Sequence, residues 1–143
     1  MPQIDFYILH TQNRYAKDRF TCQLTDKAWH QGYRIYIQTT SLAQAQQLDN
    51  FLWVFKEESF LPHDIYPEMS ESLAPIRIGY SAQVCEGMDV LINLTETVPP
   101  FFESFQRIAE IVNDTPYAKQ AGRTRYRFYR DKAYVLKTHD IHR

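Results

Sequence analysis

The residues best suited to chemistry lie near the end of the chain, where positive charge and tyrosine are concentrated. From Lys119 to Lys137 there are seven lysines or arginines and a single acid, Asp131. This window has a formal charge of +6 in a chain whose net charge is −1, so the remaining residues sum to −7. Basic and aromatic side chains in such a mixture can follow a nucleic-acid backbone, bind an acidic peptide, or form a solvated helix face.

This basic window has two structural interpretations. In a strand, Arg123, Arg125 and Arg127 share one face. A helix instead gathers four cations and one tyrosine within about 100° of arc, namely Lys119, Arg123, Tyr126, Arg127 and Arg130. Like charges at this helical spacing repel by about 0.2–0.5 kcal/mol per pair, so the arrangement is favoured where an anion binds. With a tyrosine among the cations, the helical interpretation predicts a site for an anion attached to a hydrophobic group.

Residues typical of catalysis or metal binding are sparse. His63 precedes Asp64 and could be oriented by it as a general base, but no serine or cysteine nucleophile occupies a recognisable turn. His139 and His142 could chelate a metal weakly, but they fall in a C-terminal stretch, about 137–143, that we expect to be flexible. We therefore expect a non-catalytic protein with no metal and no cofactor.

Strands and helices that could position these residues alternate along the chain. Apolar runs rich in β-branched residues predict strands at 4–9, 33–39, 75–80 and 89–94. Helical spacing of apolar residues predicts helices at 15–31, 41–55 and 101–112, and Pro116 opens a fourth element. A long connection is marked by Pro62, Pro67 and Pro75. The pattern predicts a single domain, residues 1–143, with a three-layer α/β/α fold and a mostly parallel sheet.

The loop after the first predicted strand argues against nucleotide binding. Open α/β sheets bind nucleotides at the carboxyl ends of their strands, and a phosphate loop needs glycines for close backbone approach. The segment LHTQNRY (9–15) contains no glycine, and the whole chain has only four. We expect a nucleotide-binding-like fold that lacks the phosphate loop.

Composition and cysteine spacing indicate the compartment. The apolar runs are far shorter than the roughly 20 residues of a membrane span, and the N-terminus has no basic region before its apolar stretch. Cys22 and Cys85 match no metal or redox spacing, which is typical of buried free thiols. These features predict a cytoplasmic protein.

The second predicted helix carries one aromatic residue outside its apolar face. Its core stripe consists of Ala45, Leu48, Leu52 and Phe55. Trp53 falls more than about 70° outside this stripe, and Phe60 follows in an irregular segment. Either Phe60 covers Trp53, or the two form an exposed patch for another protein, since aromatic residues dominate interface hot spots.

Five segments, in collinear order over about residues 4–136, resemble the chi subunit family of bacterial DNA polymerase III holoenzyme. The segments are FYIL, WHQGYR, LDNFLWVFKEESFLPH, DVLINL and R-x-R-Y-R-x-Y-R. The resemblance implies a non-catalytic accessory protein of the clamp loader. It implies one surface for the small psi subunit and another for the acidic C-terminal tail of single-stranded DNA-binding protein, which ends in a phenylalanine with a free carboxylate.

The resemblance also assigns roles to residues of this chain. The tail-binding arginine of the family corresponds to Arg123, followed by Tyr126 and by Arg127, where the family motif has lysine. Trp53 and Phe60 correspond to the aromatic residues that face psi. The tail-binding set expected from the resemblance and the helical stripe together is Arg123, Tyr126, Arg127, Lys119 and Arg130.

Two departures and two alternatives remain at this level. The chain is shorter than the family pattern over 115–123, and Gly122 inside the predicted helix costs about 1 kcal/mol relative to alanine. The rival function is a direct single-stranded nucleic-acid binder that uses the same basic stripe, and an enzyme that lacks a phosphate loop is the third alternative. The acidic remainder of the chain disfavours this rival and predicts little direct DNA binding. Whether a repair helicase docks on the Trp53 surface is left open.

Overall fold

The computed structural model describes residues 2–11, 13–55, 61–66, 74–82 and 86–142. A seven-stranded sheet with the order β3-β4-β2-β5-β6-β1-β7 forms its centre, and all six pairings are parallel. The strands are β1 (Gln3–Leu9), β2 (Ile35–Gln38), β3 (His63–Tyr66), β4 (Ile76–Gly79), β5 (Val90–Asn93), β6 (Arg107–Val112) and β7 (Val135–Ile141). The helices are α1 (Ala16–His30), α2 (Leu42–Val54) and α3 (Pro116–Asp131), with a short 3-10 helix, η1 (Phe102–Ser104).

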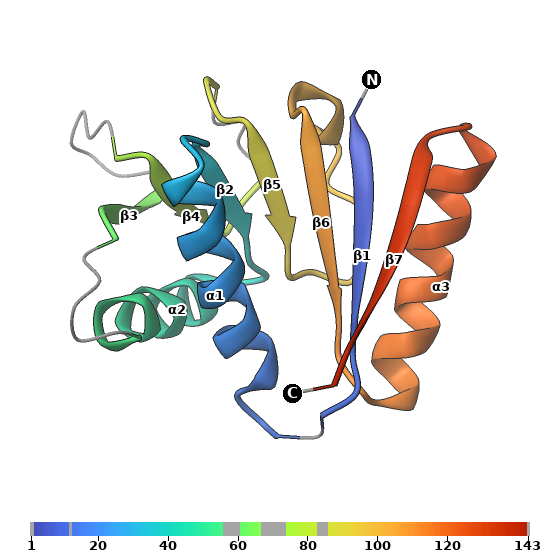
Figure 1. Cartoon of the computed structure of the whole chain (residues 1–143), viewed down its shortest axis with the longest axis horizontal. Helices are drawn as coiled ribbons and strands as arrows, with labels where there is room; N and C mark the ends of the chain where they lie inside the picture. The colour runs from blue at the N-terminus through green and yellow to red at the C-terminus, as the bar shows by residue number, and fades with distance from the viewer. Residues whose placement is uncertain (1, 12, 56–60, 67–73, 83–85, 143) are drawn as a thin grey trace.

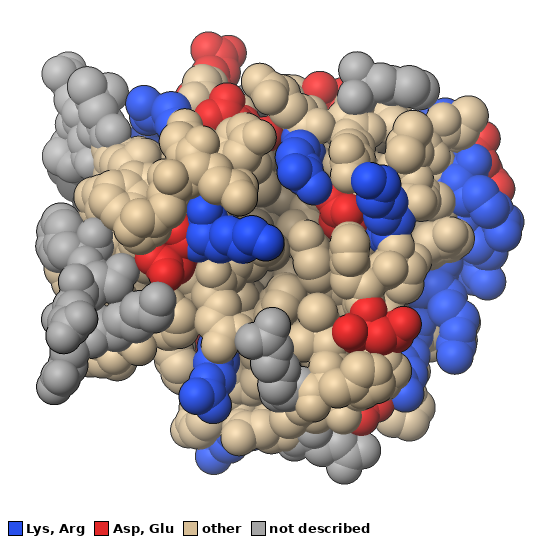
Figure 2. Space-filling model, in the orientation of Figure 1, with Lys and Arg blue, Asp and Glu red and all other residues tan. Residues whose placement is uncertain are grey.

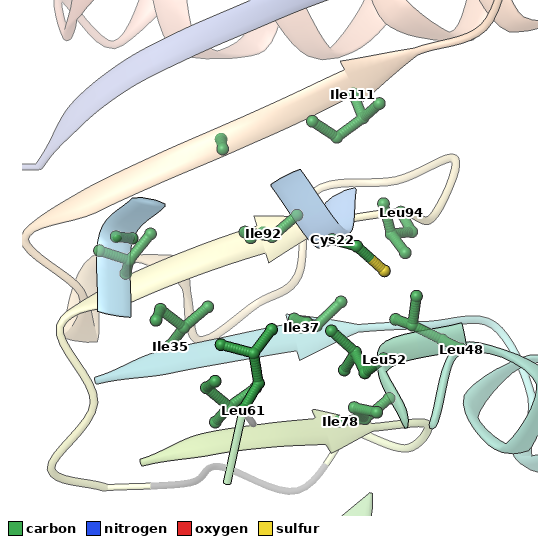
Figure 3. Packing of buried hydrophobic residues seen from close by; sticks show 14 of the residues in the cluster. Cys22, Ile35, Ile37, Leu48, Leu52, Leu61, Ile78, Ile92, Leu94 and Ile111 are labelled. Atoms are coloured by element: carbon green, nitrogen blue, oxygen red, sulfur yellow. The ribbon is translucent and has the colours of Figure 1, made fainter. Parts of the chain in front are cut away.

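Helices cover both faces of the sheet, which gives the three layers expected from the sequence (Figure 1). On one face, Cys22 of α1 and Leu48 of α2 pack with the buried isoleucines of the central strands (Figure 3). On the other face, Tyr129 of α3 and Phe102 of η1 pack with Phe6 of β1. The α/β fold class is therefore confirmed, and the sheet is wholly parallel rather than mostly so.

The cysteine prediction is confirmed where the structure describes the residue. Cys22 is a free, fully buried thiol. Burial, with the nearby charge of Asp18, raises the pKa of this thiol to about 12, so it stays protonated at neutral pH. Cys85 lies outside the described residues.

The helix predicted over 101–112 is wrong. This segment forms η1 and then β6, which lies between β5 and β1 in the sheet. Phe101, Phe105, Ile108 and Val112 are all buried and are spaced as on one side of a helix, which explains the error. A central strand is buried on both faces, so β6 shows no alternation that would have marked it as a strand.

The strands at the two edges of the sheet were also missed. β3 lies within the proline-rich connection, directly after Pro62. The flexible C-terminal tail predicted at about 137–143 is wrong, because residues as far as Ile141 belong to β7 and pair with β1 in an unbroken register from Gln3↔Val135 to Leu9↔Ile141. The polar composition of β7 hid the strand, since an edge strand buries little apolar surface.

Candidate functional site

The basic window of the sequence folds as α3, which decides between its two interpretations in favour of the helix. Thr115 caps the helix, its side-chain oxygen accepting a hydrogen bond from the Ala118 N–H at 3.1 Å. Pro116 occupies the first turn, where its missing N–H is harmless. The helix ends before Ala133, whose φ of 64° turns the chain towards β7.

The inner face of α3 is held by a buried polar network that centres on Glu110 of β6. Arg125 Nε donates to Glu110 Oε1 at 2.8 Å, and Tyr129 OH donates to Glu110 Oε2 at 2.7 Å. Asn93 Nδ2 donates to both carboxylate oxygens, at 3.0 and 3.1 Å. All four residues are at least 96% buried, so the network fixes the rotation of α3 about its axis.

Sequence reasoning did not identify this network. Arg125 belongs to the basic window but points inward, and Glu110 was placed on a helix that does not exist. Burial raises the pKa of the Glu110 carboxyl, and the positive charge of Arg125 acts against that shift. The ion pair therefore keeps a carboxylate in the core that would otherwise tend to bind a proton.

Gly122 explains how α3 comes so close to the sheet. A Cβ on this residue would lie 3.0 Å from Cγ2 and 3.2 Å from Cγ1 of Val112 on β6. The lack of a side chain at Gly122 thus permits close packing of helix on strand, which compensates for its poor helix propensity.

The outer face of α3 carries the predicted site. Arg123 and Arg127 are exposed, whereas Tyr126 is half-buried, with its ring packed edge-on against Phe6 at a centroid distance of 5.3 Å. Figure 2 shows Lys and Arg side chains gathered along the edge of the molecule where Figure 1 places α3. Among the residues that the structure describes, Arg123 forms no hydrogen bond or ion pair, and Arg127 reaches only Thr124 Oγ1 at 3.5 Å. The structure therefore brings Arg123, Tyr126 and Arg127 together on one face, and the two arginines among them are open to solvent.

The other two predicted cations already have partners. Lys119 Nζ lies 2.9 Å from Asp114 Oδ1. Arg130 Nη2 lies 3.3 Å from Asp131 Oδ1. Both ion pairs are solvent-accessible, and such pairs contribute little free energy, so each can be exchanged for another anion.

The second predicted surface lies at the end of α2. Trp53 is 52% exposed and Val54 is 78% exposed, whereas the preceding residue, Leu52, belongs to the core stripe and is buried. The Trp53 ring contacts the ring of His63 at 4.5 Å, and His63 Nε2 lies 3.2 Å from Asp49 Oδ1. The exposure of Trp53 agrees with the surface interpretation, and Phe60 lies outside the described residues.

His63 and His139 each lie against an aspartate that is distant in the sequence. His63 faces Asp49, while Asp64 accepts a hydrogen bond from Arg77 Nε at 2.9 Å. His139 lies on β7, where its Nε2 is 3.0 Å from Oδ1 of the buried Asp5. No group of three or more metal-binding side chains occurs in the described part of the chain, and no helix within it is long and apolar enough to cross a membrane.

The described residues thus define an all-parallel α/β protein whose candidate site is the basic outer face of a helix. The family model described as "DNA polymerase III chi subunit, HolC" matches residues 1–137, so the chain belongs to this family. The chain is 38% identical to DNA polymerase III subunit chi of Pseudomonas aeruginosa PAO1, with 100% of this chain and 99% of that protein aligned. It is 29% identical to DNA polymerase III subunit chi of Escherichia coli K12 over 96% of this chain and 97% of that protein. The resemblance seen in the sequence is confirmed, and it supports an accessory role in DNA replication.

Solved structures with the same fold include two proteins of low sequence identity. T4 UvsW aligns over 98% of this chain and 41% of its own, with a TM-score of 0.72 and 7% identity. The C-terminal domain of a possible DNA helicase from Lactobacillus plantarum WCFS1 aligns over 94% of this chain and 84% of its own, with a TM-score of 0.55 and 13% identity. At such identities the likeness shows the fold alone.

Proposed function

We propose that this protein is a non-catalytic adaptor of the DNA polymerase III holoenzyme. The outer face of α3 binds the acidic C-terminal tail of single-stranded DNA-binding protein. The exposed end of α2, around Trp53, binds a psi subunit that connects the chain to the clamp loader. The adaptor thereby couples the replicase to protein-coated single-stranded DNA.

One observation carries the tail-binding half of the proposal. Arg123 is exposed and unpaired within the described residues, next to the half-buried ring of Tyr126. A guanidinium can meet a carboxylate through two parallel N–H···O bonds, which makes Arg123 a suitable partner for a terminal carboxylate. Tyr126 and the aliphatic stem of Arg127 offer apolar contact for the terminal phenylalanine.

The remaining cations fit a supporting role. Lys119 and Arg130 flank the arginines on the same face and can attract upstream acids of the tail through screened interactions. Because both already pair with aspartates, an incoming acid replaces an existing partner rather than filling an empty site. Their expected contribution is accordingly smaller than that of Arg123.

The psi half of the proposal depends on the apolar end of α2. Trp53 and Val54 are adjacent at the end of the helix, and both side chains are exposed. Large exposed aromatic residues are typical of interface hot spots. Phe60 is proposed as a further psi contact on the family correspondence alone.

Titration calorimetry of four combinations tests the tail-binding role. A synthetic acidic peptide that ends in phenylalanine, with either a free or an amidated C-terminus, is titrated into the wild type and into Arg123→Ala. Amidation should weaken binding strongly in the wild type and have little effect in Arg123→Ala. Both changes remove the same interaction, the one between Arg123 and the terminal carboxylate. Equal losses on amidation in both proteins would mean that Arg123 is only one more charge on a basic face.

Direct binding of single-stranded DNA is the second candidate function, since the same face combines cations with aromatic rings. The acidic remainder of the chain opposes it. We expect a Kd poorer than about 10 μM for single-stranded oligonucleotides at physiological salt, measured by fluorescence anisotropy. Low-micromolar or tighter binding would favour the nucleic-acid binder over the adaptor.

A further inference from the structure

β7 forms one edge of the sheet, and no strand pairs with its outer side in the described part of the chain. β7 contains seven residues, no proline and no bulge in its pairing with β1. The opposite edge strand, β3, has only four residues and directly follows Pro62. Sheet edges expose unpaired N–H and C=O groups, and short strands and prolines are common ways of protecting them. β7 has neither protection.

The pairing with β1 determines which main-chain groups of β7 face outward. The His10 N–H donates to the Ile141 carbonyl at 2.8 Å, so Ile141 faces β1. Main-chain groups of successive residues in a strand point to opposite sides. His139 and Lys137 therefore also face β1, whereas Leu136, Thr138 and Asp140 direct their N–H and C=O groups to the open edge. No strand lies beyond β7 in the described part of the chain.

Positive charge borders this edge. α3 packs against β7, and Figure 1 shows the helix running alongside the strand. The exposed cations of α3 and of the turn that follows it are Arg123, Arg127, Arg130 and Lys132. Acids in the same region include Asp131, which pairs with Arg130, Asp140, which pairs with His10, and Glu103, which interacts with Tyr134. The border therefore has an excess of positive charge.

We propose that an extended acidic peptide adds to β7 as an eighth strand of the sheet. Its main chain bonds to the outward groups of Leu136, Thr138 and Asp140, and its alternate side chains, which are acidic, face the cations of α3. Strand addition of this kind obtains affinity from main-chain bonds and selectivity from alternate side chains. The inference rests on the proposed function in one respect, that the peptide is the segment preceding the terminal phenylalanine of the tail.

Charge decides between an acidic peptide and a second copy of this chain. A dimer formed edge to edge through β7 would bring two basic α3 helices close together, and like charges at an interface oppose association. An acidic peptide instead neutralises the same cations. The free edge accordingly fits the peptide.

Amide hydrogen exchange followed by NMR tests the proposal directly. The probe is a short synthetic peptide with aspartate at alternate positions and a C-terminal phenylalanine with a free carboxylate. The amides of Leu136, Thr138 and Asp140 should gain at least about tenfold protection when the peptide binds, while those of Lys137 and His139, already bonded to β1, should change little. Peptide binding without this alternating gain would overturn the proposal.

Peptides with methylated main-chain nitrogens provide a second test that leaves the protein unaltered. Methylation of every second nitrogen removes donors from one edge of the peptide only. One of the two methylation registers should weaken binding at least about tenfold and the other should have little effect. Equal effects of both registers would contradict strand addition.

A matched pair of variants tests whether the peptide pairs with β7. Thr138→Pro removes one outward N–H, whereas Thr138→Val keeps that N–H and the shape of the side chain. Thr138→Pro should weaken peptide binding and Thr138→Val should not, with circular dichroism confirming that both variants fold. If Thr138→Pro fails to fold, the exchange pattern and the methylated peptides still decide.

The results separate this proposal from the proposed function. Binding that requires Arg123 but leaves the outward amides unprotected supports tail recognition and overturns strand addition. Protection of the outward amides in Arg123→Ala at the same peptide concentrations as in the wild type supports strand addition and overturns the role of Arg123. An absence of any binding overturns both. Protection that rises with protein concentration in the absence of peptide would identify a second copy as the occupant.

Discussion

Arg123 and Arg125 lie two residues apart on α3 and have opposite environments. Arg125 is 4% exposed and forms an ion pair with the fully buried Glu110. Arg123 is exposed and has no partner among the described residues. The same side chain thus anchors the helix on one face and is available to a ligand on the other.

The difference in burial gives the two arginines different roles, Arg125 in the stability of the fold and Arg123 in the proposed binding. A buried guanidinium whose carboxylate partner lies in the core is required for the fold, since an unpaired buried charge is very unfavourable. An exposed guanidinium contributes almost nothing to the fold and can be reserved for recognition. The network around Glu110 supports the proposed binding face indirectly, because it fixes which residues of α3 face solvent.

The largest expected effect is the loss of Arg125. Arg125→Ala leaves Glu110 without its ionic partner in the core, so we expect the free energy of unfolding to fall by about 3–5 kcal/mol. Urea denaturation measures this change. Arg123→Ala is the matched control and should change the same free energy by less than about 0.5 kcal/mol.

A double substitution sharpens this first prediction. Arg125→Met with Glu110→Leu removes both charges and should recover much of the stability lost in Arg125→Met, because no unpaired charge remains. Equal stability of Arg125→Ala and Arg123→Ala would show that the two faces of α3 do not differ as proposed.

Arg123 should instead dominate binding. Arg123→Ala is expected to reduce the affinity for a tail peptide by about 2–4 kcal/mol, and Arg123→Lys should restore only part of it, because an ammonium cannot form the bidentate pair. Titration calorimetry gives both values. Full recovery by lysine would contradict a bidentate role and leave only a charge effect.

Trp53 offers a contrast on the other surface. Trp53→Ala should weaken binding of a psi partner by at least about 2 kcal/mol, as for an aromatic hot spot. The affinity for the tail peptide should stay within about twofold, because distant sites are nearly independent. Loss of peptide binding in a variant that circular dichroism shows to be folded would argue against two separate surfaces.

The sequence allowed much of the fold to be predicted, but not the two faces of α3. Strands such as β1 and β5 and the helices α1 and α2 are marked by their apolar patterns, and the helical stripe correctly left out Arg125. The burial of Arg125 could not be predicted, because its partner Glu110 is 15 residues away and belongs to a strand whose apolar spacing imitates a helix. A long-range ion pair becomes visible only once both elements are placed.

The candidate site shows the same division. The grouping of Arg123, Tyr126 and Arg127 followed from helix geometry, and the exposure of Trp53 followed from its place outside the apolar stripe. The partners of Lys119 and Arg130 were not foreseen, since short surface ion pairs depend on rotamers that a sequence does not specify. β7 was missed because its seven residues are mostly exposed and polar.

A pH dependence follows from the burial of Glu110. Burial raises the pKa of this carboxyl, and loss of the Arg125 charge should raise it further. A carboxyl with a higher pKa in the folded than in the unfolded state stabilises the fold at low pH and loses that contribution as the pH rises through the folded-state pKa. The stability of Arg125→Met, relative to wild type, should therefore fall as the pH rises above the folded-state pKa that Glu110 has in the wild type, by about 1.4 kcal/mol for each unit of additional pKa difference.

Urea denaturation over a series of pH values measures this fall. Arg123→Met is the control, because its charge lies at the surface and its relative stability should be nearly independent of pH over the same range. A parallel pH dependence in both variants would mean that Glu110 does not titrate differently without Arg125.

The smallest expected effect concerns the two outer cations that already have partners. Lys119→Ala and Arg130→Ala should each weaken peptide binding by less than about 1 kcal/mol, because an exposed pair with the peptide only replaces an exposed pair with aspartate. Both substitutions should chiefly reduce the salt dependence of the affinity, which calorimetry at two ionic strengths would reveal. Asp114→Asn provides the opposite change, since it releases Lys119 from its ion pair and should strengthen peptide binding slightly at low salt. A loss in Lys119→Ala as large as that in Arg123→Ala would place the carboxylate contact at Lys119 and remove the distinction drawn between paired and unpaired cations on this face.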